Sequence, residues 1–389
     1  MATPFAHAKL AAGAFVLLAG AAALAVQVMG DPSAAGPRRI VELTPGPTNA
    51  EAAPVVSFGA LSEDGYSFEL PPDLQDAFSE EGPHPNAPAS ADGVVASADA
   101  PPGQLRIAVV DSAPTRPATQ PLPRAPIAGL FERGPLGMLP IIGRDGRTPA
   151  RAYARPFTGD NRPRVAIIVG GLGFNQRNTT QAIEELPPEV TLSFVPYANN
   201  LQSWIDRARA RGHEVMLELP MEPFDPEADD TGPQTLATTL SAQQNTQRLE
   251  NLLSRAAGYF GVTNYQGGRF ATSASATAPV AQQLRRRGLV MLTSGIGQRS
   301  ALAIEAGRAG LPISAADRIL DTRREADAID EQLLNLEALA LQHGNAIGAG
   351  FAYPVTMEQI ATWARAIGGR GYVLAPVSAV IDQRNQRRR

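Results

Sequence analysis

Short apolar segments alternate with helical stretches in the second half of the chain, and this alternation limits the fold more than any other feature. The first segment, Val165–Val169, is a β-branched, mostly apolar run typical of a strand buried on both faces. The other predicted strands are Val190–Val195, Glu214–Leu219, Gly258–Asn264, Leu289–Thr293, Ile313–Ala316, Ala346–Phe351 and Tyr372–Pro376. Because parallel strands need a crossover connection, repeated strand–helix units predict a parallel sheet.

Helical stretches separate these strands. They are Leu201–Arg211, Ser241–Ala257, Ala278–Arg287, Glu325–His343 and Thr356–Ile367. Seven or eight such units in a domain of about 220 residues indicate an α/β fold, a deformed (β/α)7-8 barrel. A doubly wound open sheet is the alternative. The glycines after the first strand match neither a dinucleotide fingerprint nor a Walker pattern, so they do not predict a nucleotide site.

The N-terminal segment predicts export. Leu10–Met29 carries no charge and is long enough for one bilayer crossing. Residues 1–30 are therefore either a signal anchor or a signal peptide cleaved near Ala23-Leu24-Ala25. We favour the anchor, because the apolar run continues beyond that cleavage site. The anchor predicts a single-pass inner-membrane protein with its domain in the periplasm, and cleavage predicts secretion.

Composition divides the rest of the chain. Most of the 34 prolines lie between Asp31 and Pro163, where they disfavour helices and interior strands. We expect a disordered Pro/Ala-rich linker over 31–124, an extended arm over 125–160 that docks on the barrel in one interpretation, a domain over 161–382 and a basic tail over 383–389. There is no cysteine, and the net charge of −4 gives no indication of nucleic-acid binding.

In a barrel of this kind, the functional side chains lie at the carboxyl ends of the strands. Glu218 and Glu222 flank the end of the third predicted strand and form a possible acid/base pair. Other candidates for ligand binding at these ends are Gly170, Gly171, Tyr197, Phe224, Asn264, Tyr265, Arg269, Phe270 and Tyr353. The aromatic rings suit stacking on sugars or packing in the core. Arg269 and Glu222 also suit an ion pair with each other.

Histidine is scarce, and its positions do not predict a metal site. His213 and His343 each follow a helix and precede a strand, which places them at the amino-terminal end of the barrel. There they suit the capping of helix C-termini. Carboxylates after the third strand offer oxygen ligands for a hard cation, but no imidazole accompanies them.

These segments carry a family resemblance. From about Pro163 to Val380 the chain resembles the divergent polysaccharide deacetylase family, a branch of the NodB-like carbohydrate deacetylases. The matching motifs are VAIIVGGLGF, VTLSFVPYA, ARGHEVMLELPMEP, FGVTNYQGGRF, RRRGLVMLTS, AIGAGFAYPVTMEQI and VLAPVS, in order. The resemblance implies an envelope domain with a deformed β/α barrel. In active relatives it implies metal-assisted amide hydrolysis on an acetylated amino sugar.

The chain departs from that family pattern at the metal-binding positions. Gly170-Gly171 stands where the family commonly carries two aspartates, and Glu218, Tyr265 and Phe351 stand where it often carries histidines. Thr293 replaces an aspartate. Glu222, Asn264, Arg269 and Phe270 match the pattern.

The departures predict a domain that has lost the metal-dependent deacetylase site and that binds envelope glycan, such as peptidoglycan or another amino-sugar polymer, or an envelope protein. No cofactor is expected under this interpretation. The alternative is an active carbohydrate N-deacetylase or hydrolase with a rebuilt acidic site at Glu218 and Glu222. A divalent metal belongs only to that alternative.

Overall fold

The computed structural model describes residues 120–297 and 299–387. The predicted leader and nearly all of the predicted linker lie outside these residues. Within the described ranges, no helix combines the length and the apolar character that a bilayer crossing requires.

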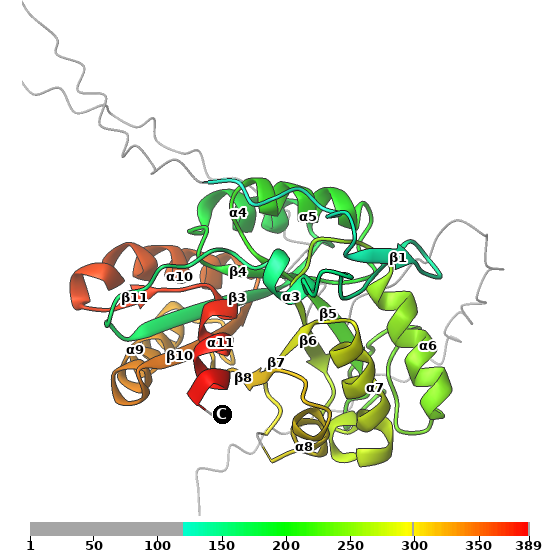
Figure 1. Ribbon diagram of the computed structural model, residues 1–389. Coiled ribbons are helices and arrows are strands. Elements are labelled where there is room, and N and C mark those ends of the chain that lie inside the picture. Colours follow the sequence, from blue (N-terminus) through cyan, green and yellow to red (C-terminus); the bar gives the residue numbers. More distant parts are fainter. Residues whose placement is uncertain (1–119, 298, 388–389) are drawn as a thin grey trace, which may run out of the picture. The chain divides into compact units, whose positions relative to one another are not determined.

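A curled, entirely parallel sheet forms the centre of the domain (Figure 1). Its strands are β3 (Arg164–Leu172), β4 (Thr191–Phe194), β5 (Val215–Met221), β6 (Gly261–Gln266), β7 (Val290–Thr293), β8 (Ile313–Ala315), β9 (Arg318–Ile319), β10 (Asn345–Phe351) and β11 (Val373–Leu374). The hydrogen-bonded order is β8-β7-β6-β5-β4-β3-β10-β9, and β11 pairs with β3. The predicted strands correspond closely to these elements. The prediction from sequence did not include β9.

The two ends of this sheet are neighbours in the sequence. Strand β8 pairs with β7 at one edge of the sheet, and β9 pairs with β10 at the other edge. Only Ala316 and Asp317 separate β8 from β9. The sheet therefore curls into a half-barrel whose first and last strands are joined through one bent segment but do not pair with each other.

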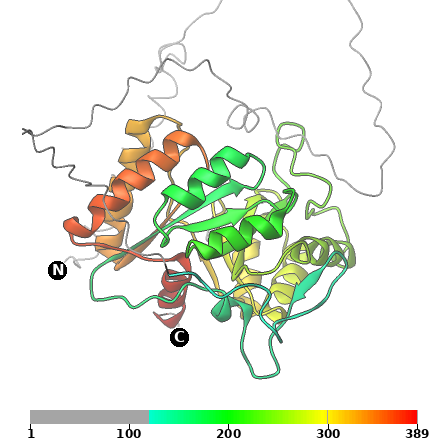
Figure 2. The same cartoon turned by 90° about the horizontal axis from the view of Figure 1, so that it is seen from above.

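Helices cover the outer face of the sheet. They are α4 (Gln176–Glu185), α5 (Leu201–Ala210), α6 (Ala242–Leu253), α7 (Ala274–Arg286), α8 (Ala301–Arg308), α9 (Ala326–His343) and α10 (Pro354–Ile367), with short 3-10 turns at Phe270–Thr272 and Gly368–Arg370. Side chains of Asn175, Ser241, Ser273 and Ser300 cap four of these helices at their N-termini. Figures 1 and 2 show the helices arranged around the strands.

Alternate residues of β3, β5, β7 and β10 enter two different cores. Val165, Ile167 and Val169 of β3 pack with the covering helices. Ala166 and Ile168 point to the inner face, where the core includes no residue of α4 to α10. This one-sided placement of the helices distinguishes the domain from a doubly wound sheet, which carries helices on both faces.

The arm before the barrel packs on its amino-terminal end. It forms an antiparallel hairpin of β1 (Phe131–Arg133) and β2 (Met138–Pro140), followed by the short helix α3 (Pro149–Ala152). Tyr153 belongs to the inner core, and Leu130 is buried.

Arg209 of α5 holds the arm. Its guanidinium is buried, with the side chain only 1% exposed, and donates to the backbone oxygens of Pro123 (3.0 and 3.2 Å), Tyr153 (2.9 Å) and Gly258 (2.9 Å). It also lies 5.1 Å from the centre of the Tyr153 ring.

The C-terminal helix α11 (Val377–Arg387) closes the same end of the barrel. Buried Glu214 accepts hydrogen bonds from Ser378, from the Thr191 hydroxyl and from the backbone of Arg155, and so links helix, strand and arm. Residues 383–387, predicted to belong to a separate tail, continue this helix. Arg384 pairs with Asp317 at 2.5 Å and donates to Ala315 at 2.9 Å, at the junction of β8 and β9.

Candidate functional site at the carboxyl end of the barrel

The first strand ends in a bulge that turns a backbone N–H toward the barrel interior. The pairing of β3 with β4 shifts register between Val169 and Leu172, as happens where a strand carries an extra residue. Gly171 lies within the bulge at φ 74°, a backbone conformation that favours glycine. Its N–H donates to Oε1 of Glu218 at 2.7 Å.

Glu218 occupies the space beside Gly170. Its carboxylate comes from the neighbouring part of the sheet, on β5, and Oε1 also accepts a hydrogen bond from the Ser193 hydroxyl at 2.9 Å. A Cβ atom on residue 170 would lie 2.8 Å from that same Oε1. The absence of a side chain at residue 170 is therefore what leaves room for the carboxylate of Glu218.

Burial controls the charge of Glu218, which is only 3% exposed. Loss of hydration raises its pKa to about 7, against the smaller lowering effects of the Gly171 N–H and the Ser193 hydroxyl. The carboxyl group is consequently close to half-protonated at neutral pH. This charge state is suited to exchanging a proton with a bound molecule or to accepting a cation.

A small pocket opens onto this carboxylate. It is lined by Ile168, Gly170, Ser193, Glu218, Thr263, Asn264, Tyr265, Ser294, Ile319, Ala349, Gly350 and Phe351. Its volume of about 40 Å³ is enough for roughly three water molecules. The rings of Tyr265 and Phe351 meet edge to face, with centroids 6.4 Å apart. The pocket thus admits a small group rather than a whole sugar ring.

Asn264 shapes the pocket through its own hydrogen bonds. Its amide nitrogen donates to the backbone oxygens of Gln266 (2.7 Å) and Ser294 (3.0 Å), and its Oδ1 accepts from the Ser294 N–H at 2.9 Å. These bonds tie the end of β6 to the loop after β7. Asn264 therefore positions the wall of the pocket.

The predicted acid/base pair of Glu218 and Glu222 is not assembled in this pocket. Glu222 does not line it. Oε2 of Glu222 accepts from the N–H and the hydroxyl of Thr238 at 2.5 and 2.6 Å, and Oε1 lies 3.4 Å from Nε of Arg269. Glu222 and Arg269 hold the loops that follow β5 and β6, as the ion-pair interpretation of these two residues expected.

The predicted aromatic candidates are dispersed. Phe270 is fully buried in the outer core, and Tyr353 is buried beneath the guanidinium of Arg324, 4.3 Å from its ring centre. Phe224 is 71% exposed and its ring lies against Gly268. Of the predicted aromatic residues, Tyr265 lines the pocket beside Glu218.

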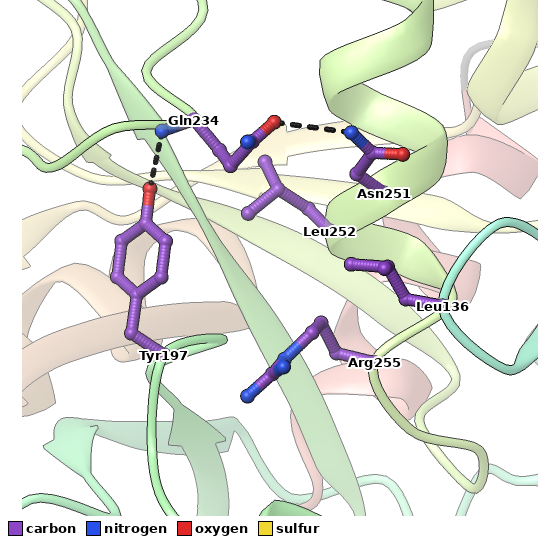
Figure 3. Close-up of a pocket in the computed structure, with 6 residues that line it drawn as sticks. All are labelled: Leu136, Tyr197, Gln234, Asn251, Leu252 and Arg255. Carbon is purple, nitrogen blue, oxygen red and sulfur yellow. Dashed lines mark hydrogen bonds between the residues drawn. The ribbon is translucent and has the colours of Figure 1, made fainter. Parts of the chain in front are cut away.

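Tyr197 lines a different pocket, drawn in Figure 3. Its hydroxyl accepts a hydrogen bond from the Gln234 N–H at 3.0 Å, and the Gln234 side chain in turn bonds to Asn251 at 3.3 Å. Leu136 of the arm, Leu252 and Arg255 complete the lining. Tyr197 thus packs between the loop after β5 and the arm.

The residues of the pocket do not fit a metal centre. Protein metal sites gather several carboxylate, imidazole or thiolate ligands around one ion, whereas Glu218 is the pocket's one carboxylate and the remaining polar groups are hydroxyls and an amide. Across residues 120–297 and 299–387, no three acidic, histidine or cysteine side chains are grouped to hold an ion. Both ring nitrogens of His213 are engaged in contacts at hydrogen-bond distance, Nδ1 with the backbone oxygen of Val190 at 2.8 Å and Nε2 with that of Ile183 at 3.2 Å, so neither is available as a metal ligand.

Sequence reasoning placed Ser294 at the carboxyl end of a strand but missed the other two hydroxyl groups of the pocket, those of Ser193 and Thr263. Ser193 and Thr263 occupy inward-facing positions of β4 and β6, and Ser294 follows β7. The available signal was the alternation of strand residues between the two faces, which places Ser193 on the opposite face from Leu192 and Phe194, and Thr263 on the opposite face from Val262.

We predict that Glu218→Gln changes the pH dependence of stability. The glutamine oxygen still accepts from Gly171 and Ser193, but the variant has no carboxyl group to titrate. Because the folded pKa is raised from 4.5 to about 7, the stability that this group provides is complete below pH 4.5 and is lost as the pH rises through 7. The wild-type free energy of unfolding should therefore fall by about 3 kcal/mol relative to the variant between pH 4 and pH 8. Urea unfolding at both pH values measures this difference, and a constant difference would contradict the prediction.

The chain is similar to several proteins from bacteria. A crystal structure of an uncharacterized protein from Agrobacterium tumefaciens C58 is similar at a TM-score of 0.61 and 41% identity, covering 63% of this chain and 100% of that one. YibQ of Escherichia coli K12, uncharacterized, is 24% identical over 196 residues, which are 50% of this chain and 60% of YibQ. An uncharacterized Haemophilus influenzae protein is 22% identical over 195 residues, 50% of this chain and 68% of its own.

The matched region coincides with the curled sheet and its helices. The sequence pattern of divergent polysaccharide deacetylases matches residues 167–381, which extend from within β3 into α11. With more than half of the chain matched, this protein belongs to the divergent polysaccharide deacetylase family.

Proposed function

We propose that the domain binds an amino-sugar glycan of the cell envelope at its carboxyl-end pocket and does not hydrolyse it. The observation that carries the proposal is the position of Glu218. Its carboxylate takes the space that a side chain on residue 170 would need, so the pocket offers one carboxylate and several hydroxyls in place of a metal-ligand set. Membership of the deacetylase family supports the substrate class.

The proposal includes a place in the cell. Leu10–Met29 is suited to anchor the chain in the inner membrane, with the domain in the periplasm, where envelope glycan is present. An envelope protein is the other partner that this location allows.

Tyr265→Ala tests the binding site. Tyr265 lies at the pocket beside Phe351, and an aromatic contact contributes about 0.5–1.5 kcal/mol beyond its buried area. We expect a Kd for chitin or peptidoglycan oligomers that is about 2- to 12-fold higher. Calorimetric titration of the full chain in detergent measures it. Phe131→Ala, which removes an aromatic ring from the hairpin β1–β2 outside the pocket, is the matched control. Equal affinities of wild type and Tyr265→Ala would refute the site.

Hydrolysis by a rebuilt site is the second candidate, and the raised pKa of Glu218 favours it, because a carboxyl group with a pKa of about 7 suits general acid–base catalysis. Glu218 would act without Glu222, which is bonded to Thr238. Acetate release from N-acetylated oligomers, assayed with and without divalent metals, separates the two functions. Release that disappears in Glu218→Gln would establish the hydrolase and overturn the proposal of binding alone.

A further inference from the structure

Glu218 is the one charged side chain that lines the carboxyl-end pocket. Both of its hydrogen bonds, from Gly171 and from Ser193, go to Oε1. Oε2 accepts no hydrogen bond from any residue in the described part of the chain. Oε2 is not among the buried unpartnered side-chain atoms of the described residues, so it reaches the pocket and is available to accept from a bound donor.

Two hydroxyl groups line the same pocket as this carboxylate. They belong to Thr263 and Ser294, and neither side chain has a hydrogen bond at its hydroxyl to another described residue. Together with Oε2 of Glu218 they offer three acceptors. A primary ammonium group carries three N–H donors and no acceptor, and so it matches this set.

The rings at the pocket favour the same ligand. Tyr265 and Phe351 pack edge to face at the lining, and a cation near an aromatic face is attracted by the ring quadrupole. The volume of about 40 Å³ accommodates a small substituent while the sugar that carries it stays at the mouth. An acetamido group is larger, carries no charge and brings a carbonyl oxygen toward Glu218.

We propose that the pocket recognises the free primary amine of an N-deacetylated amino sugar, held by Glu218, in preference to the N-acetylated form. The inference rests on the proposed binding of amino-sugar glycan and names the chemical group that this site selects. The group is bound as an ammonium opposite the Glu218 carboxylate; an uncharged amine takes its proton from the protonated Glu218 carboxyl group or from water, a protonated carboxyl group facing an ammonium releases its proton to water, and no bond to carbon forms or breaks. The domain would thus distinguish deacetylated from acetylated stretches of a glycan.

Titration of the full chain in detergent with a glucosamine tetramer and with an N-acetylglucosamine tetramer, at neutral pH, tests this selectivity. We expect the free-amine tetramer to bind at least about 10-fold more tightly, as charge-assisted hydrogen bonds require. Glu218→Gln should lower affinity for the amine tetramer at least about 10-fold and change affinity for the N-acetyl tetramer by less than about 2-fold.

Asp225→Asn is the control for general attraction between an acidic surface and a cationic oligomer. Asp225 is exposed in the loop after β5 and caps the backbone of Glu227 and Ala228, and asparagine preserves that cap. Its affinities should match those of the wild type. Equal binding of both tetramers, or an unchanged affinity in Glu218→Gln, overturns the amine preference and leaves the glycan-binding proposal standing. No binding of either tetramer overturns both.

Discussion

Arg209→Met is expected to lower the free energy of unfolding by about 3–5 kcal/mol and to release the N-terminal arm from the barrel. The guanidinium donates to backbone oxygens of Pro123, Tyr153 and Gly258. Methionine fills a similar volume but removes the donor of all three oxygens, of which the hydrogen bonds to Tyr153 and Gly258 are buried. Burial already lowers the pKa of Arg209 to about 10, and it stays charged at neutral pH because its hydrogen bonds replace lost hydration.

Two measurements check this expectation. Urea unfolding gives the stability change, and limited trypsin digestion reports release of the arm through faster cleavage after Arg124 and Arg133. Arg207→Met is the matched control, on the same helix but 43% exposed in its pair with Glu184. An exposed pair contributes about 0–1 kcal/mol, so Arg207→Met should stay within that range. A similar loss in both variants would show that Arg209 has no special role in docking the arm.

Gly170→Asp is expected to destabilise the domain by about 2–4 kcal/mol, through steric overlap and through a second carboxylate in a buried site. The new Cβ would lie 2.8 Å from Oε1 of Glu218 and 3.1 Å from the Ser193 hydroxyl. The same substitution at Gly307 of α8, where a Cβ meets no atom within 4 Å, should change stability by less than about 1 kcal/mol.

The compensating change isolates the cause. If Gly170 is required because Glu218 occupies the neighbouring space, then Gly170→Asp should lower the free energy of unfolding much less in a chain that also carries Glu218→Ala. A double-mutant cycle should give a coupling of at least about 1 kcal/mol. Additive effects in that cycle would mean that glycine is required by the backbone at residue 170 and not by the carboxylate of Glu218.

The strands were predictable because each is specified by a local pattern. β-branched and apolar runs such as Val165–Val169 are buried on both faces, and the intervening helices leave parallel pairing as the way to connect them. Strand β9 was not predictable. Its two residues are too few to show the alternation of apolar and polar side chains that marks a strand, and they pair with β10 because the sheet curls. The hairpin β1–β2 was similarly hidden within the predicted arm.

The site was only partly predictable. Position at the carboxyl end of a strand was enough to select Gly170, Gly171, Glu218 and Tyr265, which the structure gathers around one pocket or its bulge. The same rule also selected Glu222, which bonds to Thr238 in the loop before α6, and Phe270, which packs in the outer core. Strand position says which end of the sheet a residue occupies, but the direction of its side chain depends on contacts that no local pattern contains.

The bent segment of β8 and β9 bears on how the protein is made. Strand β3 emerges early during synthesis, yet its partners β10 and β11 come near the end, and Arg384 of α11 reaches the β8–β9 junction later still. Pairing of distant segments is slow, and an unpaired strand edge promotes aggregation. A nascent chain therefore carries an open edge on its most apolar strand until translation is almost complete. If translation pauses before β10 has been synthesised, β3 has no partner at that edge and the sheet stays incomplete.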